Sequence, residues 1–453
     1  MNSPLLPTTT KGALALVTGA LAATLSFSSM AAPTVTSVIV ESLESDDTTI
    51  TVQGSGFGAK SQAAPILFDQ VDSSYENGTL NESYQTLTDG AKVPATGQGQ
   101  PSIWSAVSSG AWGSFPPEIA SQYTPRYNNS GKHYLMLGHN STVGNPVAYG
   151  GNSGWETPVD NTQLYVSWWF RPKYAPQWYW RVAPVNLTGQ FQEGETLNVG
   201  GVTKATFIGI DEEGQINLVF DGKPPRTAVL LGVEILGESS GATSTFPETF
   251  VGSGGPGYET PGSQKYIRIW EDPQGKEGIR FSWTQMHQTV GSVVNWSTAP
   301  VKGGEWNHLE LEMDTQKGLV RLRVNARELT SFSFDPSLDY KGKWSPTVAL
   351  MGLNGKVGKL QESYVDDIYI DNTLQRVMLG NAPTIDQVTL YENQRPVKWS
   401  DNQVELKLYQ GAIENLDAAY LYVFDSSGLT NSEGYPLCME CKLPPEKIEL
   451  IVD

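Results

Sequence analysis

Short runs of alternating apolar and polar residues dominate the chain from Thr34 onward. The most regular runs are Thr34 to Glu41, Thr48 to Gln53, Gln163 to Arg171, Gly278 to Gln285, His308 to Asp314, Leu319 to Asn325, Tyr364 to Asp371, Gln403 to Tyr409 and Ala419 to Asp425. Clusters of Gly, Pro, Asn and Asp separate them. A period of two with frequent turn signals is typical of antiparallel sandwiches. The pattern therefore predicts an all-β fold.

The first residues have the pattern of an export signal. Lys11 precedes an apolar run from Gly12 to Phe27, and small residues follow as far as Ala32. This order is that of a secretory signal peptide and predicts cleavage after Ala31. Because no later run of about 18 apolar residues occurs, we expect a secreted protein, either periplasmic, extracellular or on the cell surface, with no membrane insertion after cleavage. A retained membrane anchor is the alternative.

Length and charge narrow the classes of protein. A chain of 453 residues predicts two to four domains. The 48 acidic residues exceed the 30 Lys and Arg residues, and the net charge of −18 argues against a nucleic-acid partner because the molecule as a whole repels phosphate backbones. The expected division is a signal peptide at 1–31, a short β segment at 32–65, a large sandwich in two parts at 66–186 and 247–381, an inserted module at 187–246 and a final domain at 382–453.

Two terminal segments resemble immunoglobulin-like domains. Residues Thr49 to Gly58, Thr-Ile-Thr-Val-Gln-Gly-Ser-Gly-Phe-Gly, resemble the strand and turn of IPT/TIG modules of secreted bacterial proteins. We expect the glycines to supply positive-φ positions beside a buried Phe57. The segment is short for a full module, so pairing with the carboxyl-terminal segment is the alternative. Residues 382–453 resemble a further immunoglobulin-like sandwich.

The large sandwich resembles a known family at the level of its strands. The phrase Trp306-Asn-His-Leu-Glu-Leu311 and the later Asp366-Asp-Ile-Tyr-Ile-Asp371 are similar to strands of concanavalin A-like or laminin-G-like jelly rolls, found in bacterial surface proteins, lectins and some polysaccharide lyases. The resemblance implies an antiparallel jelly-roll sandwich whose concave face meets glycans. Fold alone does not imply an activity.

The insertion at 187–246 carries two recognisable phrases. They are Phe191-Gln-Glu-Gly-Glu195 and Gly237-Glu-Ser-Ser-Gly-Ala-Thr243, which resemble a small β module of phage virion and bacterial surface proteins. Loops tolerate such insertions.

Four aspartates are the best candidates for a metal site. Asp69 belongs to the opening strand of the jelly roll, and Asp366, Asp367 and Asp371 belong to its closing strand. First and last strands of jelly rolls are often neighbours, and calcium binds several carboxylate oxygens. Strand alternation places Asp367 and Asp371 on one face with Tyr369, and Asp366 on the other. Structural calcium is therefore one hypothesis, and a solvated polar strand is the other.

Tryptophans near one strand are candidates for a glycan platform. In the run from Val166 to Phe170, alternation places Val166, Trp168 and Phe170 on one face and Trp169 on the other. We expect Trp169, Trp178 and Trp180 to be the exposed set that stacks on sugar rings. The alternative is that these rings belong to the sandwich core.

The strongest catalytic candidates lie in the phrase Gln285-Met-His287. It is loosely similar to the Gln-Ile-His motif of jelly-roll alginate lyases, in which Gln and Arg neutralise the uronate, His abstracts a proton and Tyr returns one. That resemblance implies roles for Gln285, His287, Arg268 and Tyr364. Glu310 and Glu312 share a strand face, so they are either a carboxylate pair of a glycoside hydrolase or part of a polar outer face.

The only two cysteines are Cys438 and Cys441. In an exported protein we expect them to form a disulfide, since neighbouring prolines and the absence of a nearby His argue against redox or zinc roles.

These observations favour a non-catalytic, lectin-like multidomain protein that binds a polysaccharide or cell-surface glycan. One alternative is a polysaccharide lyase or glycoside hydrolase acting at the concave face, and another is a structural surface or filament subunit that self-associates.

Overall fold

The computed structural model describes the chain in separate ranges. They are residues 31–41, 48–82, 86–92, 118–121, 125–127, 131–136, 147–150, 162–173, 178–210, 214–220, 227–246, 265–270, 280–284, 287–290, 293–295, 300–336, 347–350 and 363–437. Cys438, Cys441, Gln285 and the predicted signal peptide up to Met30 lie outside them. No helix within the described ranges is long and apolar enough to cross a membrane.

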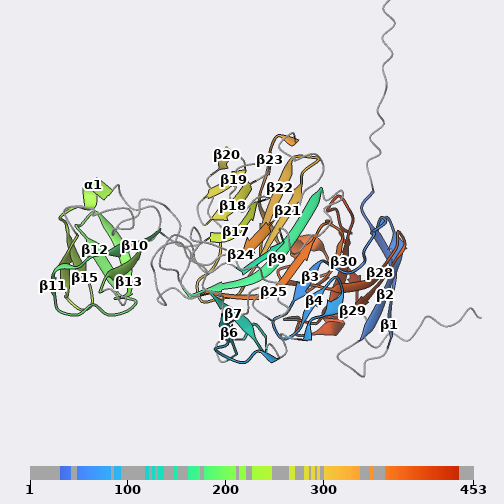
Figure 1. The fold of residues 1–453 in the computed structure, drawn as a ribbon, viewed down its shortest axis with the longest axis horizontal. Coiled ribbons are helices and arrows are strands. Elements are labelled where there is room, and N and C mark those ends of the chain that lie inside the picture. Colours follow the sequence, from blue (N-terminus) through green and yellow to red (C-terminus); the bar gives the residue numbers. More distant parts are fainter. Residues whose placement is uncertain are drawn as a thin grey trace, which may run out of the picture. The chain divides into compact units, whose positions relative to one another are not determined.

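The fold is all-β, as the alternating pattern predicts. The largest sheet has ten strands, of which β9, β21, β22 and β25 lie side by side (Figure 1). Its strands along the main path are β23(Arg327–Ser333), β22(Leu319–Val324), β21(Asn307–Asp314), β9(Gln163–Pro172), β25(Ser363–Asp371), β3(Leu67–Asp69), β4(Ser74–Glu76) and β5(Thr79–Leu80), while β7(His133–Met136) pairs with β25 and with β6(Glu118–Ala120). The predicted runs that begin at Gln163, His308, Leu319 and Tyr364 are all confirmed as strands.

A six-stranded sheet shares a core with the ten-stranded sheet. Its order is β20(Val293–Asn295), β19(His287–Val290), β18(Arg280–Thr284), β17(Lys265–Trp270), β24(Thr347–Leu350) and β8(Val147–Gly150). Trp168 of β9 packs edge-on against Trp283 of β18 at 6.3 Å between ring centroids. Val166, Trp168 and Phe170 all lie in this core, which confirms the alternation predicted for β9. Two antiparallel sheets around one core form a β-sandwich.

A seven-stranded sheet has its own core. Its order is β10(Trp178–Val182), β14(Ile216–Phe220), β13(Thr203–Ile210), β12(Thr196–Val199), β15(Glu234–Gly237), β16(Thr243–Thr245) and β11(Val185–Thr188), with the short helix α1(Thr227–Leu230) between β14 and β15. The sheet therefore starts at Trp178, upstream of the expected boundary at Leu187.

Glu195 links the two sequence motifs of this module, residues 191–195 and 237–243. Its carboxylate is 6% exposed and accepts hydrogen bonds from the backbone N–H groups of Gln192, Ser239 and Ser240 and from the Ser240 hydroxyl. Burial opposes the charged form, but these donors outweigh it and lower the pKa of Glu195. The side chain of Glu195 thus stabilises the turn that contains Ser239 and Ser240.

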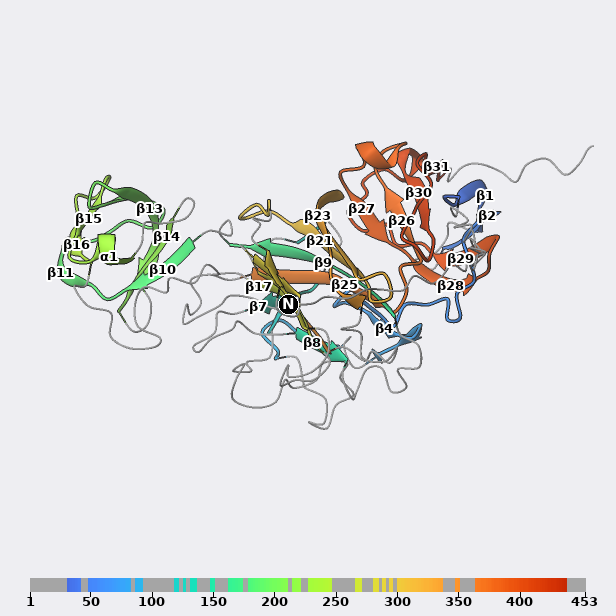
Figure 2. The ribbon, with the colours of Figure 1, turned by 90° about the horizontal axis from the view of Figure 1, so that it is seen from above.

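The two ends of the described chain form one sandwich. The blue strands β1(Thr34–Glu41) and β2(Thr49–Ser55) lie beside β29(Gln403–Lys407) and β28(Arg395–Trp399) (Figure 2). The second sheet consists of β27(Tyr391–Asn393), β26(Arg376–Gly380), β30(Tyr420–Phe424) and β31(Tyr435–Pro436), and the two sheets share a core. Pairing of β2 with β29 confirms that the amino-terminal segment completes the carboxyl-terminal sandwich. As predicted, Phe57 is fully buried between Gly56 (φ 75°) and Gly58 (φ 71°).

Candidate functional site

The ten-stranded sheet has one face toward the sandwich core and one away from it, which we call its outer face. In β25, Val365, Ile368 and Ile370 belong to the core. Tyr364 and Asp366 point to the outer face because they alternate with Val365. Many polar and aromatic side chains line this face, including Tyr165, Glu310 and Tyr369.

The carboxyl-terminal sandwich covers part of the outer face through buried ion pairs. Arg376 is fully buried, and its Nη2 donates to Oε1 of Glu312 at 2.8 Å. The guanidinium carbon of Arg376 lies 4.0 Å from the ring centre of Tyr165 and 3.7 Å from that of Phe424. Burial alone would raise the pKa of Glu312, but Arg323, Arg376 and Arg321 lower it to about 2. Glu312 is therefore an anion held between the two domains.

Glu310 is held in the same part of the outer face. Tyr165 donates to its Oε1 at 2.9 Å, and the Tyr391 hydroxyl donates to its Oε2. Burial raises the pKa of Glu310. Glu310 and Glu312 are 0% and 3% exposed, so neither carboxylate can reach a glycosidic bond. The hydrolase hypothesis for this pair is wrong, because the next domain covers both side chains.

Arg126 binds two of the four aspartates that the sequence offered as metal ligands. Its Nη2 donates to Asp367, its Nη1 donates to Glu392 at 2.5 Å, and its Nε lies 3.8 Å from Asp366. Tyr409 also donates to Asp367, at 2.7 Å. Although burial opposes its charge, these acidic groups raise the pKa of Arg126 above its ordinary value. The guanidinium supplies the positive charge that a cation would have supplied.

The remaining two aspartates are also occupied, each by a different partner. Asp69 accepts a hydrogen bond from the Tyr134 hydroxyl at 2.6 Å, and Asp371 accepts one from Lys60 Nζ at 2.7 Å. Burial raises the pKa of Asp69 and of Asp371 to about 6. Within the described ranges, no group of three or more His, Cys, Asp or Glu side chains is arranged to hold a metal ion. Asp69, Asp366, Asp367 and Asp371 thus do not form one ligand set, and calcium binding stays a prediction.

A β-bulge explains why the alternation expected for the closing strand fails. The register of β25 against β9 shifts between Asp366 and Tyr369, and Asp367 has a φ of 43°. The extra residue turns Asp367 to the same side as Asp366, so that both contact Arg126. The predicted separation of these two aspartates is wrong for that reason.

The prediction that Trp169 is an exposed platform is also wrong. Trp169 is 6% exposed, stacks on His308 at 4.9 Å and lies under the guanidinium of Arg126 at 4.7 Å. It does point away from the core, but other side chains cover it. Trp178 and Trp180 belong to β10 of the seven-stranded sheet, and their side chains lie outside the described part.

The lyase residues do not come together as the motif implies. Arg268 lies in β17, and β18 ends at Thr284, which pairs with His287 at the start of β19. His287 therefore does not continue the strand of Arg280. Tyr364 belongs to the other sheet and points to its outer face. The two sheets separate Tyr364 from Arg268 and His287 by the thickness of the sandwich core.

Four side chains meet at the end of the outer face that the carboxyl-terminal sandwich leaves open, and we call them the Arg171 cluster: Arg171, His133, Trp306 and Tyr364. The guanidinium carbon of Arg171 lies 5.7 Å from the ring centre of Tyr364. The ring of His133 packs edge-on against Tyr364 at 5.2 Å and against Trp306 at 5.7 Å. Arg171 and Trp306 are half-buried, whereas His133 and Tyr364 are buried beneath them.

The loop that presents Trp306 is tied to the sheet. The side chain of Asn307, which is fully buried, accepts a hydrogen bond from Lys302 N at 3.0 Å and donates to the carbonyls of Lys302 and Glu305 at 3.0 and 2.7 Å. Gly304 has a φ of 72° and donates its N–H to the carbonyl of Pro172, while Arg171 Nε donates to the Gly304 carbonyl at 3.0 Å. These bonds thus fix the backbone next to Trp306 and the guanidinium of Arg171.

His133 keeps unused hydrogen-bonding capacity. It is 1% exposed, and neither ring nitrogen has a hydrogen-bond partner in the described part of the chain. Burial, reinforced by the nearby Arg171, lowers the pKa of His133 to about 4. The imidazole is therefore neutral at pH 7 and offers one donor and one acceptor.

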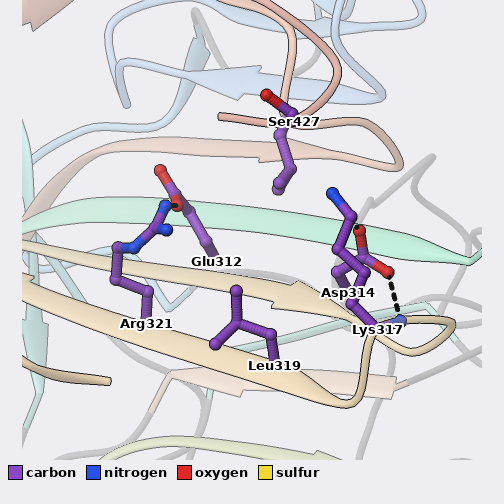
Figure 3. Close-up of a pocket in the computed structure, with 7 residues that line it drawn as sticks. Glu312, Asp314, Lys317, Leu319, Arg321 and Ser427 are labelled. Carbon is purple, nitrogen blue, oxygen red and sulfur yellow. Dashed lines mark hydrogen bonds and ion pairs between the residues drawn. The ribbon is translucent and has the colours of Figure 1, made fainter. Parts of the chain in front are cut away.

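A small pocket lies at the opposite end of the outer face. Glu312, Asp314, Lys317, Arg321 and Ser427 line it, and Lys317 N donates to Asp314 at 2.9 Å (Figure 3). Its volume of about 10 Å³ is room for one water molecule. This pocket is too small for a sugar.

Sequence reasoning missed His133, Arg171 and Trp306. One signal was available, since Arg171 follows Trp169 by two residues on a strand and so shares its face. The pairing of Arg171 with Tyr364 across strands, and the approach of His133 from β7, depend on sheet order.

Comparison with known proteins gives no family. No protein-family model and no curated protein matches the chain. Among solved structures, the binding domain of Paraclostridial Mosquitocidal Protein 1 aligns with 68% of this chain and 57% of its own at 10% identity and a TM-score of 0.26. Botulinum neurotoxin type C, in a study of its interaction with two ganglioside molecules, aligns with 80% of this chain and 65% of its own at 9% identity and a TM-score of 0.25.

Alginate lyase Aly36B in complex with alginate trisaccharide aligns with 54% of this chain and 82% of its own at 10% identity and a TM-score of 0.21. The alignments with the mosquitocidal protein and the botulinum neurotoxin cover 57% and 65% of those chains, so this chain spans less than two thirds of their length. TM-scores below 0.5 support no inference of a shared fold, ligand or activity.

Proposed function

We propose that this protein is an exported carbohydrate-binding protein that leaves its ligand intact, and that the glycan binds at the Arg171 cluster. The observation that carries the proposal is the half-buried ring of Trp306, which packs in one cluster with Tyr364, the ring over which the half-buried Arg171 lies. Aromatic rings stack on the apolar faces of pyranoses, and neighbouring polar groups then select among hydroxyl arrangements. Half-buried Arg171 supplies such a group.

Export is part of the proposal because of the signal-like run before Ala32. A protein that meets polysaccharide outside the cell needs no cofactor for binding alone. The self-association expected for a surface subunit is compatible with glycan binding and is tested separately below.

The test is co-elution of the purified protein with neutral and uronate-containing polysaccharides in size-exclusion chromatography, with polymer length read in the same run. We expect co-elution with an intact polymer, and at least tenfold weaker retention for Trp306→Ala. Trp399→Ala is the matched control, because Trp399 is also half-buried but packs in the carboxyl-terminal sandwich and donates to Gly58 O at 3.0 Å. Equal retention of Trp306→Ala and the wild type would overturn the site.

A lyase acting at the same cluster is the second candidate. It is favoured by the contact between the rings of His133 and Tyr364, because an imidazole and a phenol are groups that proton abstraction and return require, and it demands that the side chains above the buried His133 move aside. Shortened polymer that disappears with His133→Ala would establish this function instead. If no polymer is retained at all, light scattering at increasing protein concentration tests the structural-subunit alternative.

A further inference from the structure

We infer, on the basis of the proposed function, that the sugar bound at the Arg171 cluster carries a carboxylate and that Arg171 is its specificity-determining residue. The proposed function requires only a glycan. The negative charge of that glycan follows from how the Arg171 guanidinium is held and from the carboxylate partner that it lacks among the described residues.

Within the ranges that the structure describes, Arg171 is anchored through one nitrogen. Its Nε donates to the carbonyl of Gly304 at 3.0 Å, and its planar group lies over Tyr364. Among the described residues, neither Nη1 nor Nη2 has a hydrogen bond or an ion pair. The anchored Nε fixes the plane of the guanidinium, which leaves the two Nη groups as a preorganised fork for a planar, two-oxygen acceptor.

Three other arginines on this face each bind a carboxylate, whereas the half-buried Arg171 binds none among the described residues. Arg126 binds Glu392, and both Arg376 and Arg323 bind Glu312. Two nearby acidic residues already have partners: Glu305, next to Trp306 in sequence, pairs with Lys302 at 3.2 Å, and Asp89, which acts electrostatically on His133, accepts hydrogen bonds from Ser121. A ligand carboxylate would supply the missing negative charge at Arg171, whereas a neutral sugar would leave the half-desolvated cation without one.

General electrostatic attraction cannot produce such a preference. The net charge of −18 repels any polyanion at long range, so a preference for an acidic polymer must come from local contacts. The two coplanar oxygens of a carboxylate match the two Nη groups of the arginine.

The experiment compares alginate, polygalacturonate and hyaluronan with the same polymers after chemical reduction of their carboxyl groups, by affinity electrophoresis of the full mature protein. We expect at least one acid polymer to bind the wild type tenfold or more tightly than its reduced form. Arg171→Gln should lose that preference, and Arg171→Lys should retain only part of it because lysine keeps the charge but not the fork. Arg395→Gln is the matched control, because Arg395 also lies over a tyrosine, Tyr75, at 3.9 Å but outside the cluster.

Each outcome separates the inference from the function on which it rests. Equal binding of acid and reduced polymers would overturn the inference and leave the glycan-binding function intact. Retention of the full preference by Arg171→Gln would overturn the role of Arg171, and tighter binding of a sulfated polymer such as dextran sulfate would overturn the carboxylate assignment. Binding of no polymer, acid or reduced, would overturn the function and the inference together.

Discussion

The covered part and the open end of the outer face contain the same kinds of side chain in different states. Under the carboxyl-terminal sandwich, Arg376 and Glu312 bind each other and are buried. At the open end, Arg171 and His133 keep nitrogens without a partner in the described part of the chain. The residue types alone therefore do not decide between a structural and a binding role. The role of such a side chain depends on whether another domain supplies a complementary group that binds and buries it.

The largest expected difference between the two regions is in stability. Arg376→Met should lower the free energy of unfolding by about 2 to 3 kcal/mol, because the buried Glu312 loses one of its three arginine partners and keeps Arg321 and Arg323. Arg171→Met should lower it by less than about 1 kcal/mol, because no acidic partner in the described ranges is lost. Guanidinium unfolding monitored by tryptophan fluorescence measures both. Equal losses for the two variants would mean that the regions do not differ as described.

A pH series tests the covered part on its own. Burial, together with Arg126 and Arg376, lowers the pKa of His308 to about 3, while Glu310 lies 3.9 Å from its Nδ1. The folded state thus binds fewer protons here than the unfolded state between pH 3 and 6.5. The contribution of His308 to stability is complete above about pH 6.5 and is lost as the pH falls toward 3. At pH 5 the loss amounts to about 2 kcal/mol.

His308→Gln should therefore lose less stability than the wild type when the pH is lowered from 7 to 5. The difference between the two curves matters, because the raised pKa values of Asp69 and Asp371 act in the opposite direction over pH 4 to 6 in both proteins. Parallel curves would show that His308 does not titrate as its burial implies.

The smallest expected effect concerns how rigid the open end is. Asn307→Ala removes the amide that fixes the Trp306 loop, and we expect a loss of about 1 to 2 kcal/mol together with weaker retention by polysaccharide. Asn381→Ala is the control, since that exposed amide bonds to Thr389 in the carboxyl-terminal sandwich. If Asn307→Ala binds polymer as well as the wild type does, preorganisation of the loop is not needed.

The strands were predictable from sequence, whereas the site was not. Alternation correctly placed Val166, Trp168 and Phe170 on the core face because a strand has a period of two. It failed at Asp367, where one extra residue forms a bulge that no local pattern reveals. It also failed to give the burial of Trp169, because Arg126, which covers it, comes from a distant part of the chain. The local sequence determines which face of a strand a side chain points to. Its exposure also depends on residues that are distant in sequence.

Pairing of β2 with β29 has a consequence for the order in which the protein is completed. Strand β2, near the start of the described chain, hydrogen-bonds to β29, which lies about 350 residues later. The strands of the seven-stranded sheet all lie within residues 178–246, so their contacts are much closer in sequence. Contacts between residues so far apart in sequence require closure of a long loop and form late. The terminal sandwich must therefore wait until almost the whole chain has emerged, although the inserted module can fold while synthesis continues. The covered half of the outer face is consequently the last part of the molecule to lose its contact with water.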